Sequence, residues 1–184
     1  MLLALLLGLP LARAEVFTFA SDPAAPPGLV FHNGSSLGEL EGTAAFTGQL
    51  DTRTLKGTLT VPAASLTTGS GPRDTRLRSY CLEESTFPAI TFVVSGVTGD
   101  TKALQSGAGK GTVALVGTLT IRDVSRPITV PASFSYDGGA LHLAGRYDLR
   151  WAEYGVPDPA VVISALSPDM YVTFDLVSTV APAP

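Results

Sequence analysis

The chain has 184 residues, of which 45% are hydrophobic and 15% charged, a balance typical of a single globular domain. Its formal net charge is −4, and no block of lysine and arginine stands out along the sequence. These features argue against nucleic acid or an anionic membrane surface as the main partner.

An apolar run opens the chain. Residues 1–14 end in Ala12-Arg13-Ala14, a small-x-small pattern that predicts a signal peptide cleaved before Glu15. The run is shorter than the roughly 20 residues that cross a bilayer as a helix, so we expect no stable membrane insertion. Export to the periplasm or the extracellular space is therefore predicted, with an uncleaved anchor as the alternative, and residues 15–184 are predicted to form one domain.

Alternation of apolar and polar residues dominates the rest of the chain. In residues 40–50 every second residue is apolar or glycine, which is the period of a half-buried strand. The alternation resumes over 55–61, so the break at 51–54 predicts the turn of an antiparallel hairpin. The same pattern predicts further strands at 16–19, 29–32, 90–95, 112–121, 128–136, 141–151 and 170–176.

One segment has helical spacing instead. Pro72 suits a first helical turn, and Leu77 and Tyr80 follow at helical intervals, so a helix is predicted over 72–82.

Eight or nine strands with one apolar face can form a sandwich or a closed barrel. A strand over 40–50 would be about 35 Å long, and this length favours the barrel, because strands tilted by about 40° make a tall wall.

Glycine recurs on the face that is predicted to point inward. Each glycine within a strand costs roughly 0.5 to 1 kcal/mol, so several on one face need a physical reason. Missing side chains would leave room for a ligand inside an eight-stranded barrel. Glycine would also let strongly coiled strands bend at corners and bulges. Both explanations stay open for the five inward positions, which are Gly42, Gly48, Gly57, Gly117 and Gly145.

Two segments, 73–92 and 117–130, carry recognisable motifs. They contain Arg73-Asp74 before Leu77-Arg78-Ser79, Phe87-Pro88 before Phe92, and Gly117-x-Leu119-Thr120-Ile121 before Arg126-Pro127, and Glu153-Tyr154-Gly155-Val156 follows later. Together they resemble the YceI-like family, exported bacterial proteins described as polyisoprenoid-binding. The resemblance implies an all-β, antiparallel, lipocalin-like barrel of roughly eight strands with one short helix. It also implies an elongated apolar cavity that holds a long-chain isoprenoid or another lipid.

The inward aromatic and aliphatic residues are the candidates for lining this cavity. They are Phe46, Leu59, Phe92, Leu119, Phe134, Tyr147 and Phe174. Each buried CH₂ group of a ligand contributes up to about 0.8 kcal/mol, so we expect the apolar tail to dominate the affinity.

A small basic cluster lies in the predicted helix and consists of Arg73, Arg76 and Arg78. A guanidinium group matches the geometry of phosphate, so these arginines could contact an anionic headgroup. Ion pairing with nearby carboxylates is the alternative, because most surface arginines form such pairs.

No catalytic constellation is apparent in the sequence. Of the two histidines, His32 and His142, the second lies on the outward set of its strand, and no residues have the spacing of a metal site or a cofactor motif. Cys81 is the only cysteine and is expected to be a small buried hydrophobe, with a reactive or intermolecular thiol as the alternative. We therefore predict no metal, no cofactor and no enzymatic activity.

The sequence favours a protein that transports or stores one long apolar ligand outside the cytoplasm. Two alternatives remain: an enzyme that modifies a lipid in the same cavity, and a structural envelope protein whose barrel is filled by its own side chains. Whether two chains associate as a homodimer stays open.

Overall fold

A computed structural model describes residues 16–36, 38–137, 139–158 and 166–180, so the predicted signal peptide lies outside the described residues. Ten antiparallel strands make up most of this part of the chain. They are β1 (Val16–Ala20), β2 (Leu29–Ser35), β3 (Gly38–Thr43), β4 (Thr47–Asp51), β5 (Lys56–Pro62), β6 (Ala89–Gly99), β7 (Lys110–Ile121), β8 (Val124–Asp137), β9 (Ala140–Arg150) and β10 (Leu166–Val180).

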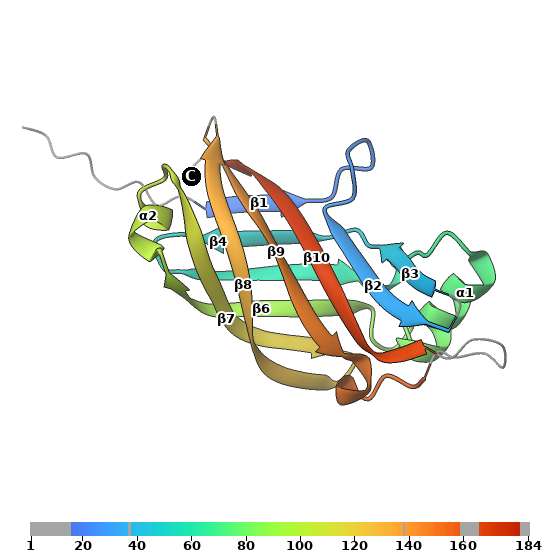
Figure 1. Cartoon of the computed structure of the whole chain (residues 1–184). Coiled ribbons are helices and arrows are strands. Elements are labelled where there is room, and N and C mark those ends of the chain that lie inside the picture. The colour runs from blue at the N-terminus through green and yellow to red at the C-terminus, as the bar shows by residue number, and fades with distance from the viewer. Residues whose placement is uncertain (1–15, 37, 138, 159–165, 181–184) are drawn as a thin grey trace, which may run out of the picture.

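Eight of these strands close into a barrel (Figure 1). β1 pairs with β4, each strand from β4 to β10 pairs with the next, and β10 returns to β1 with Phe17 opposite Val180. The apolar faces of all these strands thereby point to one interior. The predicted all-β antiparallel barrel of roughly eight strands is confirmed.

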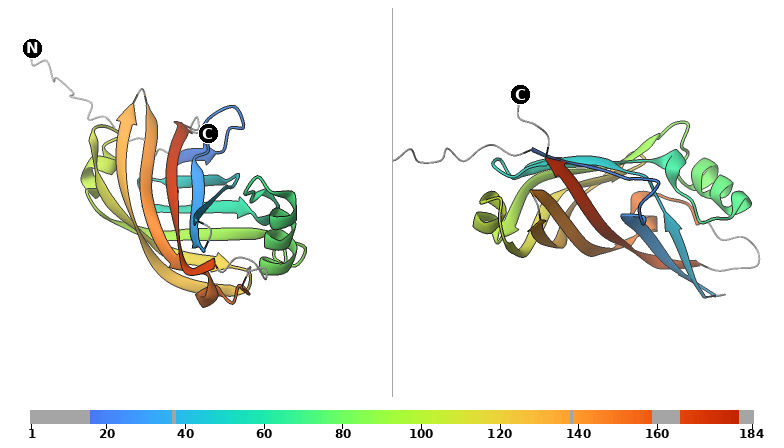
Figure 2. Two further views of the ribbon diagram at one scale, coloured as in Figure 1. Left: turned by 45° about the vertical axis from the view of Figure 1, so that its right-hand side comes forward. Right: turned by 90° about the horizontal axis from the view of Figure 1, so that it is seen from above.

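The remaining two strands extend the barrel wall at one end. β2 pairs with residues 166–174 of β10, whereas β1 pairs with residues 178–180. β3 in turn pairs with β2. β2 therefore continues the line of β1, and β3 continues the line of β4 (Figures 1 and 2).

The prediction of one continuous strand over 40–50 is wrong, because the ladder is interrupted between β3 and β4. Beside this interruption, the loop between β1 and β2 separates the two strands that pair with β4 and β3. The Phe46 carbonyl accepts a hydrogen bond from the Ser21 amide at 3.0 Å, and the Phe46 amide donates to Ser21 Oγ at 3.2 Å. The backbone and side chain of Ser21, in the loop, thus take the place of a regular strand partner for Phe46.

The turn predicted at 51–54 is confirmed. Asp51 Oδ1 accepts hydrogen bonds from the amides of Arg53 and Thr54.

Helices lie at both ends of the barrel (Figures 1 and 2). The predicted helix is confirmed as α1 (Gly71–Thr75), which runs directly into the π-helical segment η2 (Arg76–Cys81). A helix that was not predicted, α2 (Thr101–Gln105), connects β6 to β7 at the opposite end. The short 3₁₀ segments η1 (Ala63–Ser65) and η3 (Trp151–Tyr154) complete the helical structure of the described ranges. In those ranges no helix has the length and apolar character needed to cross a bilayer.

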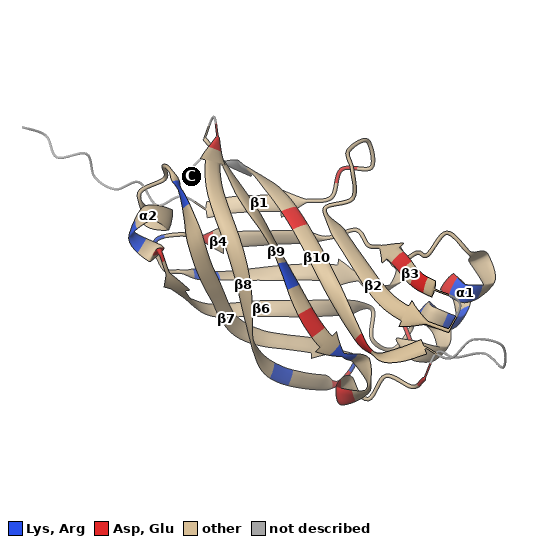
Figure 3. Cartoon of the chain, viewed as in Figure 1, with Lys and Arg blue, Asp and Glu red and all other residues tan. Residues whose placement is uncertain are grey.

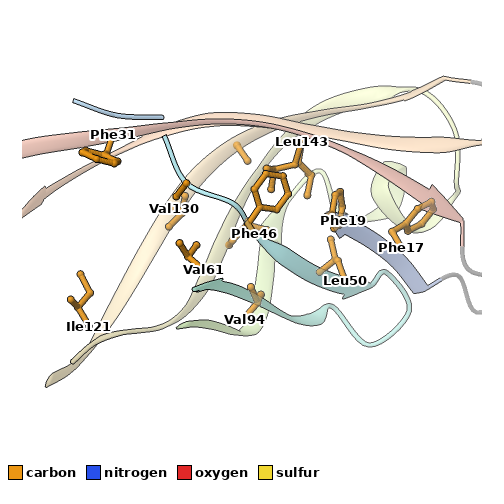
Figure 4. Packing of buried hydrophobic residues seen from close by; sticks show 14 of the residues in the cluster. Phe17, Phe19, Phe31, Phe46, Leu50, Val61, Val94, Ile121, Val130 and Leu143 are labelled. Carbon is orange, nitrogen blue, oxygen red and sulfur yellow. The ribbon is translucent and has the colours of Figure 1, made fainter. Parts of the chain in front are cut away.

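The α2 end of the barrel is closed by a packed plug. Leu104 in α2 is completely buried, and its carbonyl accepts a hydrogen bond from the Tyr136 hydroxyl at 2.6 Å. The rings of Phe17 and Phe134 pack against Tyr136 with centroids 5.6 and 6.2 Å away. Farther along the interior, side chains from several strands point toward one another, among them Phe19, Phe46, Leu50 and Leu143 (Figure 4). Leu104, Tyr136 and the rings of Phe17 and Phe134 therefore close this end of the barrel.

Candidate functional site: an apolar cavity along the barrel

Beyond the plug the barrel is hollow. A cavity of about 880 Å³ extends from Phe19 and Leu143, next to the plug, to Arg73 in α1 at the other end of the barrel. Most residues of its wall are aliphatic or aromatic, and many of them are only half-buried although they face inward, because their exposed surface borders the cavity. Examples are Leu29, Leu59, Ile90, Phe92, Leu119, Ile128, Val172 and Phe174. The predicted elongated apolar cavity is confirmed.

Five of the seven predicted lining residues lie in the cavity wall: Leu59, Phe92, Leu119, Tyr147 and Phe174. Phe46 and Phe134 do not line it. Phe46 lies in the break between β3 and β4 with its ring against Gly28, and Phe134 belongs to the plug. The wall also includes Phe31 and Met170, which sequence reasoning did not single out, although the alternation of their strands places both on the inward face.

The inward glycines make room for the large side chains that lie opposite them. A Cβ atom on Gly42 would lie 2.1 Å from Cζ of Phe31, and one on Gly145 would lie 2.5 Å from Cζ of Phe174; each glycine pairs directly with that phenylalanine on the next strand. The rings therefore lie against the wall instead of projecting across the interior. Leucines lie opposite two further glycines in the same way, in the pairs Gly48 with Leu59 and Gly57 with Leu50.

Gly117 illustrates the bending explanation as well. A Cβ atom there would lie 2.2 Å from the Val93 carbonyl oxygen and 2.8 Å from Cε2 of Phe92. The backbone of the adjacent strand approaches so closely that a side chain has no place, as occurs in strongly coiled sheets. The two explanations for the glycines thus apply together.

The exposed residues that border the cavity include residues of β3 and of α1. These two elements lie near each other at one end of the barrel (Figure 1). Besides its pairing with β2, β3 has one bridge in the described part of the chain, in which the amides and carbonyls of Thr43 and Thr67 exchange two hydrogen bonds. Beyond this bridge, residues of the cavity wall form a rim on two sides: Glu39 and Glu41 on β3, and Ser70, Pro72 and Arg73 on the loop and α1. β3 carries acidic residues and α1 carries basic residues (Figure 3).

An antiparallel barrel with a short helix and an apolar cavity is the architecture that the resemblance of the sequence motifs implied. Residues 29–178 match the family model described as YceI-like domain. The chain belongs to this family. No protein with a curated description matches the sequence.

Solved structures with the same fold support the assignment of this YceI-like barrel. The polyisoprenoid-binding domain from Saccharophagus degradans implicated in plant cell wall breakdown superposes with a TM-score of 0.71 at 16% identity, covering 92% of this chain and 100% of that chain. BcnA of Burkholderia cenocepacia gives a TM-score of 0.63 at 20% identity, covering 91% and 98%. The YceI protein of Campylobacter jejuni gives 0.61 at 19% identity, covering 78% and 86%.

The three arginines predicted to contact a headgroup, Arg73, Arg76 and Arg78, differ in their surroundings. Arg73 and Arg76 line the cavity, whereas Arg78 does not. Arg78 Nε donates to the Leu66 carbonyl at 2.8 Å, and its guanidinium pairs with Asp74 at 3.8 Å. Arg73 Nε donates to Thr68 Oγ1, and the Arg76 guanidinium lies over the ring of Tyr80 at 4.4 Å. All three therefore have structural partners, and two of them also border the opening.

Asp74 fixes the loop that carries this rim. Its carboxylate is buried and accepts hydrogen bonds from the Thr67 hydroxyl and from the amide and hydroxyl of Thr68, at 2.6 to 2.7 Å. Burial alone would raise the pKa of the Asp74 carboxyl, but these hydrogen bonds and the charge of Arg78 outweigh it and lower the pKa. The ionised form of Asp74 therefore stabilises the rim.

The reactive groups near the cavity are shielded. Cys81 is a free cysteine, completely buried in the cavity wall, and burial raises the pKa of its thiol against the charges of Arg76 and Arg122. The hydroxyls of Tyr147 and Tyr154 share a hydrogen bond, and burial raises the pKa of Tyr154 to about 12. In the described ranges no three His, Cys, Asp or Glu side chains are placed to hold a metal ion.

Both histidines lie away from the cavity wall. His142 pairs with Asp175 on the outer surface, as the outward position of His142 in its strand predicts. His32 stacks on Tyr171 with ring centroids 4.3 Å apart, and its Nδ1 lies 3.2 Å from the Glu41 carboxylate.

The contact between Gly42 and Phe31 can be tested by a double-mutant cycle. A methyl group in Gly42→Ala overlaps the Phe31 ring and forces it off the wall, so we expect the free energy of unfolding to fall by about 1 to 3 kcal/mol. Phe31→Leu should lessen this loss, which chemical denaturation of the two single variants and the double variant would measure. Gly96→Ala is the control, because a Cβ atom there has no neighbour within 4 Å. Additive effects of Gly42→Ala and Phe31→Leu would contradict the contact.

The lowered pKa of Asp74 predicts a pH-dependent loss of stability. A depressed pKa stabilises the fold above the unfolded-state value near 3.9, and this contribution disappears as the pH falls through the lower value of the folded state. We expect Asp74→Asn to be less stable than the native chain by about 2 kcal/mol at pH 6. The difference should shrink as the pH falls below about 4. A difference that stays constant down to pH 2.5 in denaturant titrations would show that the charge of Asp74 has no such role.

Proposed function

We propose that this protein binds one long-chain apolar ligand, a polyisoprenoid or a similar lipid, inside the barrel and transports or stores it outside the cytoplasm. The observation that carries this proposal is the cavity of about 880 Å³ with its largely aliphatic and aromatic wall. Membership of the YceI-like family and the polyisoprenoid-binding domain among its structural neighbours support the ligand class. The location outside the cytoplasm rests on the apolar leader predicted from residues 1–14.

The magnitudes of apolar burial agree with this ligand class. Each buried CH₂ group contributes about 0.8 kcal/mol, so a five-carbon prenyl unit contributes on the order of 3 kcal/mol before the cost of ordering the chain. Micromolar affinity requires about 8 kcal/mol, which a few units exceed even after such losses. The tail therefore supplies the affinity, and the groups at the opening select the head.

The charged groups at the opening already have protein partners. The Glu39 carboxylate accepts a hydrogen bond from the Tyr171 hydroxyl, and the Glu41 carboxylate lies 3.2 Å from Nδ1 of His32. Since the arginines also have protein partners, an anionic head would have to compete with these contacts.

Lipid extraction of the purified protein tests the proposed function. We expect native mass spectrometry to show one bound lipid per barrel and organic extraction to release a prenyl lipid. Leu119→Trp should weaken lipid binding and lower the bound mass, because Leu119 lines the cavity and the larger indole would narrow it. Thr118→Trp is the matched control on the same strand, since Thr118 is exposed and does not line the cavity.

The other outcomes separate the competing functions. A folded protein that binds no prenyl lipid, with or without Leu119→Trp, would contradict ligand binding and favour a structural role. Chemical conversion of the extracted lipid on incubation with the native protein would favour an enzyme.

A further inference from the structure

One buried side-chain amide oxygen in the cavity wall accepts no hydrogen bond. Asn33 follows Phe31 on the inward face of β2, lines the cavity and is only 6% exposed. Its Nδ2 donates to two backbone carbonyls of the β10 chain segment, that of Ser167 at 2.9 Å and that of Asp169 at 3.3 Å. Its Oδ1 is buried and accepts no hydrogen bond.

The two carbonyls fix the orientation of the amide. A carbonyl oxygen can only accept a hydrogen bond, so a rotated amide would place Oδ1 against two acceptors. The NH₂ group must therefore face β10, and Oδ1 is held as an acceptor.

In the described part of the chain, the side chains beside Asn33 do not supply the missing donor. The residues paired with Asn33 on the adjacent strands are Leu40 and Met170, whose side chains line the cavity and have no polar hydrogen to donate. The indole N–H of Trp151 is already donated to the Ser167 carbonyl at 2.9 Å. Buried acceptors in native proteins are nearly always paired, with a protein group or with ordered water.

We propose that Asn33 Oδ1 accepts a hydrogen bond from a hydroxyl group at the head of the chain bound in the cavity. A neutral hydroxyl supplies the donor without bringing a charge into an apolar wall, as an ammonium group would. Since Oδ1 is shielded from solvent, binding of the hydroxyl requires side chains of the surrounding cavity wall to shift. This inference rests on the proposed function and names the ligand class more closely: a long-chain alcohol rather than its ether or hydrocarbon.

Two probes with the same chain test the inference: geranylgeraniol and geranylgeranyl methyl ether. We expect the native protein to bind the alcohol about tenfold more tightly, which is the effect of one added hydrogen bond. Asn33→Leu should bind both probes with the affinity of the ether. Gln105→Leu makes the same change of an amide in α2, away from the cavity wall, and should keep the tenfold preference.

A spectroscopic measurement keeps the test independent of how the variant folds. Asn33 is the only asparagine in the sequence, so protein labelled with ¹³C at the asparagine side-chain carbonyl gives a single resonance. This resonance should shift on addition of the alcohol and stay in place with the ether. Equal affinities for both probes, or a resonance that neither probe moves, would overturn the role of Asn33 while leaving ligand binding intact. Failure of the native protein to bind either probe would contradict the proposed function itself.

Discussion

The structure depends on one constraint: the sheet must close on itself while its interior stays open. Closure needs the short pairing between β1 and β10, which completes the ring of eight strands. A closed barrel of eight strands is narrow enough for ordinary side chains to fill it. The hollow interior therefore requires that large inward side chains be held against the wall, and glycine on the neighbouring strand provides the space, as for Phe31 over Gly42.

The two ends of the barrel differ accordingly: one is packed with side chains, and the other borders the cavity. At one end Leu104 is completely buried, its carbonyl accepts a hydrogen bond from the Tyr136 hydroxyl, and Phe17 packs against the Tyr136 ring. At the other end β3 has an open edge next to α1, and the buried carboxylate of Asp74 orders the facing loop. The chain thus combines a rigid plug with an accessible, apolar interior in a single domain.

Sequence periodicity predicted the faces of the strands but not the depth of each residue along the barrel axis. Phe134 alternates inward as expected, yet it lies in the plug, because only the three-dimensional stagger of the strands decides where the solid part ends. The break at Phe46 depends on a loop some 25 residues earlier in the chain, so local alternation could not reveal it. Helix α2 has five residues, too few for a helical period to emerge. The unpaired oxygen of Asn33 follows from the positions of backbone carbonyls on β10, which a sequence does not specify.

Calorimetric titration of the native protein with prenols of increasing length, from geraniol upward, tests the central claim most directly. An enclosed apolar cavity of fixed size predicts that the affinity rises several-fold with each added prenyl unit and then levels off when the cavity is full. An affinity that does not depend on chain length would contradict a hollow, dry barrel interior.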